Sequence, residues 1–286
     1  MEFSELQEII RSEVASQAHL ASIRRYNHAM IDDLNNVCPL ADRTMLDVGA
    51  SVHAYALEAA LTKGVRRYEG VDLGIERHWK TPRVEFVGDA GNVGRLTRMN
   101  AGRLEFADEA FDCILTISTF EHFLDPAGVL VEMHRVLRPG GVALVTFEPV
   151  WTASYGHHLH HLGAIGKRVP DWGHLYLTET QMRAALATQP WPDDGPLDVE
   201  QAIRWIYHGG EINRFDIRRL KEVFRCSPLE IVWMCDLPDE DTGHKRTIAE
   251  YLTRLVPFST DELMTKGLSL LLRKGPGPSP GVAGST

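Results

Sequence analysis

Between residues 44 and 147, short apolar runs alternate with segments whose apolar residues recur at helical spacing, and this alternation constrains the fold more than any other feature. The apolar runs are TMLDVG (44–49), RYEGVDL (67–73), VEFVGD (84–89), FDCILTIS (111–118) and GVALVTF (141–147). We expect helices at 54–63 and 126–137, and a shorter one within 91–99. Strands that alternate with helices are joined by right-handed crossovers, so the pattern predicts an open α/β sheet with helices on both faces.

The flanks of this region have different patterns. Residues 3–36 repeat apolar positions every three or four residues and predict two helices. Residues 150–214 are rich in His, Trp, Tyr, Pro and Gly, and an α/β pattern returns at 215–237 and 267–274. We therefore predict an N-terminal helical cap (1–43), an α/β core (44–149), an insertion forming a substrate lid (150–214), the C-terminal part of the core (215–274) and a disordered tail (275–286).

Composition limits the partners. The chain has a net charge of −9, which argues against a nucleic-acid partner held by phosphate neutralisation. No run of 18 or more apolar residues predicts a membrane span, and the first residues lack the basic-then-apolar pattern of a secretory signal. The four cysteines show no CxxC spacing, which fits a reducing compartment. We expect a cytoplasmic protein with a small-molecule substrate and neither a membrane nor a nucleic-acid partner, while the oligomeric state stays open.

Polar residues follow the predicted strands where open α/β sheets bind ligands. Asp72 follows the second strand, about 25 residues after Asp47, the separation at which a carboxylate meets a ribose hydroxyl. The loop after the first strand, LDVGASVHAYA, has one glycine, Gly49, whereas a dinucleotide pyrophosphate requires several. The loop therefore disfavours a dinucleotide, and S-adenosylmethionine, which has a ribose but no pyrophosphate, fits better.

The segments LDVGAS, GVDLG, VGDA, FDCILTISTFEHFLDP and HRVLRPGGVALVTF occur in this order. Together they resemble the class I S-adenosylmethionine-dependent methyltransferases, specifically the small-molecule branch with an FD…EH…DP…LRPGG signature, over residues 44–148. The resemblance implies a Rossmann-like fold: a seven-stranded, mostly parallel sheet with helices on both faces, a helical N-terminal cap and a long insertion after strand five. It also implies S-adenosyl-L-methionine as cofactor and methyl transfer to a small molecule, for which we favour an oxygen acceptor.

Matching the motifs position by position assigns the cofactor contacts. The resemblance places the first motif against the methionine part, the acid after the second strand on the ribose, the VGDA pair on the adenine, and the end of the fourth strand beside the sulfonium. The residues so assigned are Asp47, Gly49, Ser51, His53, Asp72, Leu73, Asp89, Ala90, Ser118 and Thr119. Ser51 and His53 stand where the family pattern has glycine. We expect His53 to lie at the helix start near the methionine tail.

Histidines are the candidates for a catalytic base, because an oxygen nucleophile of high pKa needs one and imidazole titrates near neutrality. Five of the 13 histidines fall between residues 157 and 174. The candidates are His157, His158, His161 and His174 in the insertion and His122 after the fourth strand, with Glu148 as a further possibility. Glu121 and His122 could equally cap a helix. A shared helix face for 157, 158 and 161 could also bind a metal, but no cysteine or carboxylate set accompanies them, so we expect none.

Three other functions stay open at this point. The chain could be a non-methyltransferase enzyme of the same fold that uses S-adenosylmethionine differently or binds a nicotinamide cofactor. It could also be a catalytically silent binding or scaffold subunit, which Ser51 and His53 favour and the intact Asp47, Asp72 and Asp89 oppose. A metal-assisted methyltransferase is the third.

Overall fold

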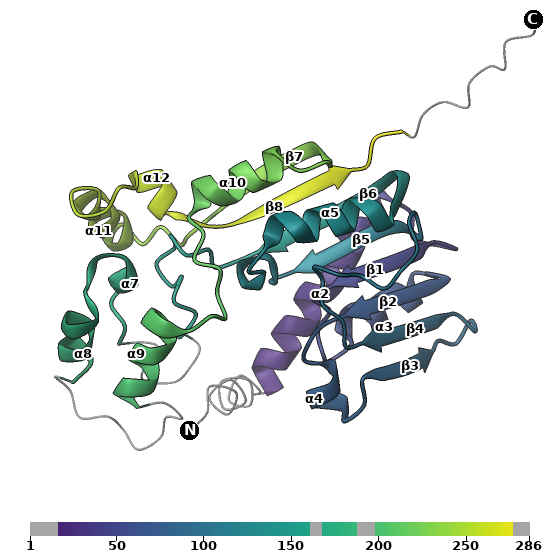
Figure 1. Cartoon of the computed structure of the whole chain (residues 1–286), viewed down its shortest axis with the longest axis horizontal. Coiled ribbons are helices and arrows are strands. Elements are labelled where there is room, and N and C mark those ends of the chain that lie inside the picture. Colours follow the sequence, from purple (N-terminus) through teal and green to yellow (C-terminus); the bar gives the residue numbers. More distant parts are fainter. Residues whose placement is uncertain (1–16, 161–167, 188–197, 277–286) are drawn as a thin grey trace, which may run out of the picture.

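The structure, a computed structural model, describes residues 17–160, 168–187 and 198–276. Eight strands form one sheet in the order β3-β4-β2-β1-β5-β6-β8-β7 (Figure 1). The strands are β1 (Thr44–Val48), β2 (Arg67–Val71), β3 (Arg83–Val87), β4 (Val93–Thr97), β5 (Phe111–Ile117), β6 (Leu137–Phe147), β7 (Glu230–Pro238) and β8 (Thr265–Arg273). Neighbours from β4 to β6 pair in parallel, whereas β3 and β8 run antiparallel to theirs. The mostly parallel α/β sheet is confirmed, with one strand more than the seven expected.

Helices cover both faces of the sheet, as the alternating pattern predicts. On one face lie α2 (Gln17–Val37), α3 (Tyr55–Thr62) and α4 (Ile75–Trp79), and on the other α5 (Pro126–Val136) and α10 (Ile217–Arg225). In α10, Ile217, Leu220 and Phe224 share one buried face, and the Asp216 carboxylate caps the helix by accepting from the Arg219 amide. The two faces therefore bury separate apolar clusters, each closed by helices.

The segment 91–99 holds a strand, β4, so the short helix expected there is wrong. Its burial alternates with a period of two, with Gly94 and Leu96 facing the core. A Cβ at Gly94 would lie 2.9 Å from the Leu57 side chain, so α3 packs closely on this strand. Because β4 occupies the place beside β2, the preceding run becomes β3, an antiparallel strand at the edge of the sheet.

The N-terminal and C-terminal parts of the chain are described only in part. Helix α2 packs along α3, and Tyr26 reaches the end of β6, where its hydroxyl lies 3.2 Å from the Thr146 hydroxyl. The first of the two helices expected within 3–36 lies outside the described residues, as do residues 277–286 of the tail. Where described, α2 thus covers the sheet next to the ends of its central strands.

The insertion packs beyond one end of the sheet (Figure 1). It contains α7 (Gly173–Tyr176), α8 (Glu179–Ala187) and α9 (Val199–His208), and it lies beside α11 (His244–Leu252) and α12 (Thr260–Leu263). Met182, Ile203 and Ile206 belong to a buried cluster formed by the insertion alone. The insertion therefore has its own small core.

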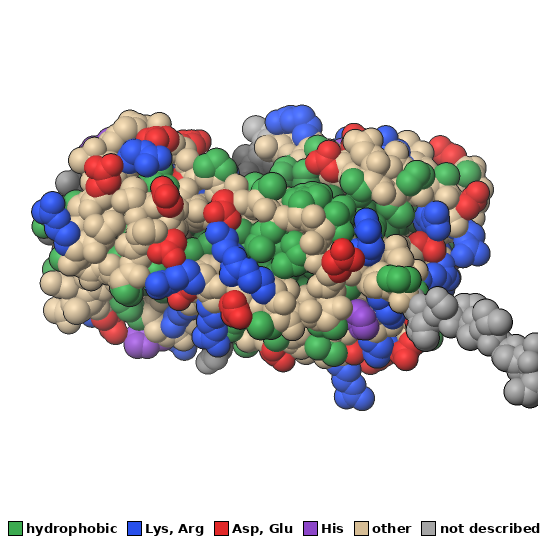
Figure 2. All heavy atoms as spheres, turned by 90° about the horizontal axis from the view of Figure 1, so that it is seen from above, with side chains coloured by type: hydrophobic (Ala, Val, Ile, Leu, Met, Phe, Trp, Pro, Cys, Tyr) green, Lys and Arg blue, Asp and Glu red, His purple; other side chains and the backbone are tan. Residues whose placement is uncertain are grey.

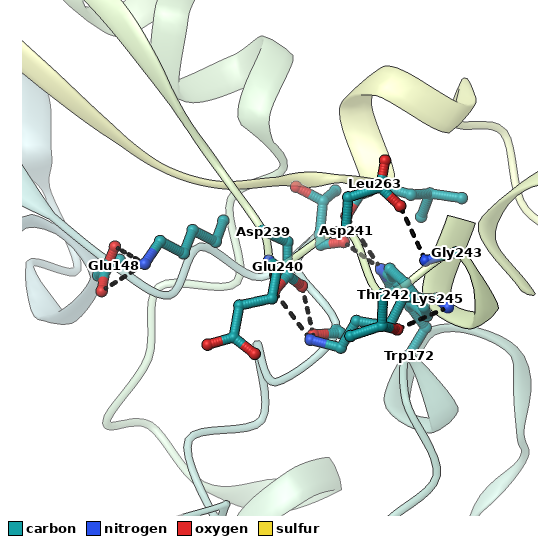
Figure 3. A network of polar contacts seen from close by, with 12 residues as sticks. Glu148, Trp172, Asp239, Glu240, Asp241, Thr242, Gly243, Lys245 and Leu263 are labelled. Carbon is teal, nitrogen blue, oxygen red and sulfur yellow. Dashed lines mark hydrogen bonds and ion pairs between the residues drawn. The ribbon is translucent and has the colours of Figure 1, made fainter.

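A buried polar network ties the insertion to the C-terminal segment (Figure 3). Lys245 Nζ donates to Asp239 Oδ1 at 2.8 Å and to Ser154 Oγ at 3.1 Å, and Ser154 Oγ donates to Asp239 Oδ2 at 2.5 Å. The two charged side chains are 8% and 6% exposed. Trp172 Nε1 adds hydrogen bonds to the carbonyls of Thr152 and Leu263. These bonds fix the start of the insertion against α11 and α12.

Replacing Lys245 by methionine is expected to lower the free energy of unfolding by about 3 kcal/mol, because Asp239 is then left as an uncompensated buried charge. Urea unfolding at pH 7 measures the change. The matched control is Lys221→Met, which removes the more exposed ion pair with Asp236 and should cost no more than about 1 kcal/mol. Equal losses in both variants would contradict a stabilising role for the buried pair.

Strand β7 forms one edge of the sheet, on the side where α10 also lies. Val232 and Trp233 of this strand are 38% and 36% exposed. Figure 2 looks onto this side and shows hydrophobic side chains gathered near its centre.

Within the described ranges, none of the helices has the length and apolar character needed to cross a bilayer.

Candidate functional site

The carboxyl ends of the central parallel strands meet at one edge of the sheet. Strand β1 lies between β2 and β5, so the strand order reverses at β1. Open α/β sheets bind ligands at the carboxyl ends of the strands where this reversal occurs. Backbone hydrogen bonds hold the following turns together: the amides of Gly49 and Ala50 both donate to the Val71 carbonyl, and the Asp72 amide donates to Thr97. Most of the sequence-predicted cofactor residues are gathered at this edge.

Gly49 makes the turn after β1 possible. Its φ of +81° is a left-handed conformation that side chains disfavour. A Cβ there would lie only 2.2 Å from Thr119 Cγ2, so the glycine also lets the end of β5 pack directly against the turn. Thr119 Oγ1 is held by donating to the Ile117 carbonyl at 2.7 Å. Ser118, with a φ of +48°, is exposed beside it.

Asp47 lies just inside this edge and is only 2% exposed. Its Oδ2 accepts a short hydrogen bond from the hydroxyl of Tyr68 in β2, while its Oδ1 is buried and has no hydrogen-bond partner among the described residues. Burial raises the pKa of Asp47 to about 7, opposed by the Tyr68 hydrogen bond and assisted by the charge of Asp72. Tyr68 is a functional candidate that the sequence reasoning missed, because it reads as an ordinary aromatic strand residue.

Asp72 and Leu73 follow β2. Asp72 Oδ1 accepts from the Gly74 amide at 2.6 Å, which fixes the carboxylate in the turn. Leu73 is 59% exposed. Both residues lie at the same edge as Gly49, as the sequence predicts.

His53 turns toward α4. Its ring lies 5.5 Å from that of Tyr55 and 5.2 Å from that of His78, between ring centroids, and its amide donates to Ser51 Oγ at 3.3 Å. Burial, with the nearby His78, lowers the pKa of His53. His53 lines a cavity of about 830 Å³ that runs along α3 to Asp89; Asp47, Gly49, Asp72 and Thr119 are not part of its lining. His53 is thus at the helix start, as expected, but faces this cavity.

Asp89 and Ala90 lie at the opposite edge of the sheet, which corrects their assignment to the adenine. They form the turn between β3 and β4, where the Gly88 amide donates to the Asn92 carbonyl. Because β3 is antiparallel, its carboxyl end meets the amino ends of the other strands. The residues that follow β4 reach the edge that holds Gly49 and Asp72 instead, among them Asn100, whose Oδ1 accepts from the Gly102 amide. The period-two alternation of VGRLT was the signal that could have found this strand.

Two of the residues predicted as the catalytic base, His157 and His174, are buried within the insertion. His157 is fully buried and His174 is 6% exposed, and their rings lie 5.4 Å apart between centroids. Burial lowers the pKa of His157 well below its ordinary range and that of His174 to about 4. Residues 151–160 form turns and no helix, so the shared helix face expected for this cluster is absent there, and His161 lies outside the described residues.

His122 and His158 come together, with 5.1 Å between their ring centroids. His122 is exposed and follows Thr119 in the short 3-10 helix η1 (Phe120–His122). Its Nδ1 lies 2.7 Å from the Glu211 carbonyl oxygen, which can only accept, so Nδ1 carries the proton and Nε2 the lone pair. His158 is bound in the same way through Nε2 to the Pro149 carbonyl at 2.8 Å, and burial lowers its pKa well below the ordinary range.

Two carboxylates stand near this pair. Glu148, at the end of β6, pairs with Lys266 at 2.9 Å. Glu121 is 2% exposed, and burial, with the nearby charge of Glu148, raises its pKa well above the ordinary range. Glu121 is therefore a buried carboxyl group beside the exposed His122, and its burial favours the protonated form. Over the described ranges, no cluster of three or more His, Cys, Asp or Glu side chains could hold a metal ion.

Comparison with known proteins fits this geometry. Residues 46–145 match the family model of a methyltransferase domain. A stretch of 134 residues is 37% identical to an uncharacterized methyltransferase of Mycobacterium sp. (strain KMS) and covers 45% of this chain and 48% of that protein. A stretch of 144 residues is 38% identical to an uncharacterized methyltransferase of Mycolicibacterium paratuberculosis (strain ATCC BAA-968 / K-10), covering 47% and 53%. The match thus spans about half the length of these curated relatives.

Solved structures share the fold over most of the chain. One is a chain in the complex of the Haloferax volcanii Trm112 methyltransferase activator with a methyltransferase, at a TM-score of 0.50, 16% identity and coverage of 94% of this chain and 98% of that one. Another is described as a sarcosine dimethylglycine methyltransferase from Galdieria sulphuraria, at a TM-score of 0.50, 14% identity and coverage of 91% and 87%. At these identities the likeness concerns the fold alone.

The sheet, the edge with Gly49 and Asp72, and the family match together define a nucleotide-binding α/β domain of the methyltransferase type. The match of residues 46–145 to a methyltransferase domain implies S-adenosylmethionine as the cofactor of this domain.

Proposed function

We propose that this chain transfers the methyl group of S-adenosylmethionine to a small-molecule acceptor, with an oxygen acceptor favoured. The observation that carries the proposal is the single edge at which Gly49, Asp72 and Thr119 meet in front of Asp47. The Oδ1 of Asp47, which is buried and has no hydrogen-bond partner among the described residues, suits the ammonium group of the cofactor's methionine part. Asp72 suits its ribose hydroxyls, and the glycine turn leaves room for a nucleoside without a pyrophosphate.

The cofactor, once bound, supplies an already activated methyl carbon. The protein then has to align the acceptor with that carbon, exclude water and take up the acceptor's proton. His122 follows Thr119 by three residues, and its Nε2 lone pair is fixed by the Nδ1 hydrogen bond to Glu211. We assign the base to His122, with His158 beside it, because His157 and His174 are buried within the insertion.

The acceptor is expected to bind between η1 and the insertion. Both sides contribute polar groups: His122 from η1 and His158 from the insertion. The network around Lys245 and Asp239 holds the start of the insertion in place, which gives this side of the site a fixed wall.

Incubation of the full chain with methyl-labelled cofactor and a panel of phenols, alcohols, carboxylates and amines tests the proposal. Label on an oxygen compound supports it, and label only on an amine would contradict the favoured acceptor class.

Asp72→Asn is expected to weaken S-adenosylhomocysteine binding about tenfold, because an amide replaces the charged acceptor for the ribose hydroxyls. Isothermal titration calorimetry measures the change. Asp89→Asn serves as the control, since Asp89 lies at the opposite edge and should leave the affinity unchanged. A loss in the Asp89 variant equal to that in the Asp72 variant would restore the sequence-based assignment of the adenine contact.

A further inference from the structure

Asp47 and Tyr68 form a buried carboxyl–phenol pair at the point where the cofactor's amino group is expected. Asp47 is 2% exposed and Tyr68 is fully buried, and each comes from one of two paired strands, β1 and β2. The Tyr68 hydroxyl donates to Oδ2 of Asp47, so only Oδ1 is left for another partner, and it has none among the described residues. A hydrogen bond to one oxygen orients the carboxyl group and stabilises its ionised form.

The surroundings of Asp47 supply no compensating cation in the part of the chain that the structure describes. Besides Tyr68, β2 leads into Asp72, a second acid. On β5 the residue in register with Asp47 is the apolar Leu115. On the helices above, Arg24 of α2 pairs with Glu58 of α3 at the exposed surface. Burial accordingly raises the pKa of Asp47 to about 7, which makes its protonated form a substantial population at neutral pH.

We propose that Tyr68 is a positioning residue for cofactor binding, and that binding of the cofactor's ammonium group drives one proton from Asp47 to solvent. This inference rests on the proposed function, because it requires the cofactor to bind beside Asp47. A cation next to a carboxyl group favours its ionised form, so the bound state holds Asp47 ionised over a wider pH range than the free protein does. The pH dependence of the cofactor affinity is then set by the number of protons that binding releases.

The direction of the pH dependence follows. Below about pH 7 the free protein carries a proton on Asp47 that must leave, so affinity falls as the pH falls. Above that value Asp47 is already ionised, and affinity becomes constant. For the native chain we expect the Kd of S-adenosylhomocysteine to weaken about tenfold between pH 8 and pH 6, with release of about one proton at pH 6.

Tyr68→Phe removes the hydrogen bond that favours ionised Asp47. The midpoint of the pH dependence should rise by about one unit, so that Kd weakens about fivefold at pH 7 and about tenfold at pH 6, yet matches the native value at pH 9. A loss of affinity that is the same at every pH would indicate a structural defect and overturn the positioning role. Tyr251→Phe, whose hydroxyl is on a residue 58% exposed, is the matched control and should change nothing.

Asp47→Asn separates this group from others that titrate nearby, such as His53. The amide oxygen can still accept from Tyr68, so the fold is retained, while the titrating group is gone. Calorimetry in buffers of different ionisation enthalpy, from pH 5.5 to 9, should show weak binding with the proton release removed. A Kd of the native chain that does not change with pH, or the same proton release in Asp47→Asn, would overturn this inference but not the proposed function. Absence of binding by the native chain at every pH would overturn the proposed function as well.

Discussion

Replacing His122 by asparagine is expected to lower kcat/KM for methyl transfer by about 10²–10⁴, the range that a positioned general base contributes. Asparagine can still donate to the Glu211 carbonyl, as Nδ1 of His122 does, so η1 should keep its position. What is lost is the Nε2 lone pair. The Kd of S-adenosylhomocysteine should stay within twofold of the native value, because we place His122 in the proposed acceptor site and not among the proposed cofactor contacts.

Two comparisons make this result interpretable. His208→Asn removes an exposed histidine that pairs with Glu179 on the insertion, and its activity should match that of the native chain. His158→Asn removes the ring that packs against His122 and should cost less than His122→Asn. Full activity in the His122 variant would rule it out as the base, and a greater loss in the His158 variant would transfer that role to the insertion.

Gly49→Ala is expected to weaken S-adenosylhomocysteine binding by about 10³, because two separate effects act at this position. The φ of +81° strains any side chain, and the added Cβ would lie 2.2 Å from Thr119 Cγ2 and 2.4 Å from its Oγ1. The contact forces the ends of β1 and β5 apart at the cofactor edge. Calorimetry measures the affinity, and circular dichroism during heating shows whether the fold is kept.

Gly140→Ala is a close control for this variant. Gly140 has a φ of +78°, nearly that of Gly49, but a Cβ there would have no atom of the described residues within 4 Å. It should therefore lose only about 1 kcal/mol of stability from backbone strain and keep its affinity. If both variants bind equally well, close packing of the Gly49 turn against Thr119 is not required for the site.

The sequence predicts the central part of the fold well because two periodicities act together there. Buried strands such as TMLDV and FDCILTI have continuous apolar runs, and the intervening helices bury one stripe, so both are visible without tertiary information. The five segments quoted for the family resemblance fall largely on these elements. The methyltransferase domain and its cofactor could accordingly be predicted.

The edge of the sheet was predicted less well, for a physical reason. VEFV and VGRLT are both short and alternate between buried and exposed positions, and parallel and antiparallel edge strands share that pattern. Nothing local fixes which strand lies beside β2. That choice depends on Gly94 fitting under Leu57, a contact between segments distant in sequence. It decides whether Asp89 or Asn100 reaches the edge at which we propose that the cofactor binds.

The histidines show a second limit. Residue type suggests a base, but the usefulness of each imidazole depends on its burial and on which nitrogen is already bound. The burial and hydrogen bonding that distinguish His157 and His174 from His122 depend on the folded structure and cannot be seen in the sequence. Tyr68 and Asp47 are a similar case. Their hydrogen bond joins residues 21 positions apart on two strands, and the sequence of neither strand predicts it.

The most direct test of this account is calorimetry of the full chain with S-adenosylmethionine, S-adenosylhomocysteine and NAD at pH 8. We predict saturable one-to-one binding of the first two compounds and none of NAD, because the turn at Gly49 has a single glycine and no further cradle for a pyrophosphate. Binding of NAD without binding of S-adenosylmethionine or S-adenosylhomocysteine would contradict the account at its centre.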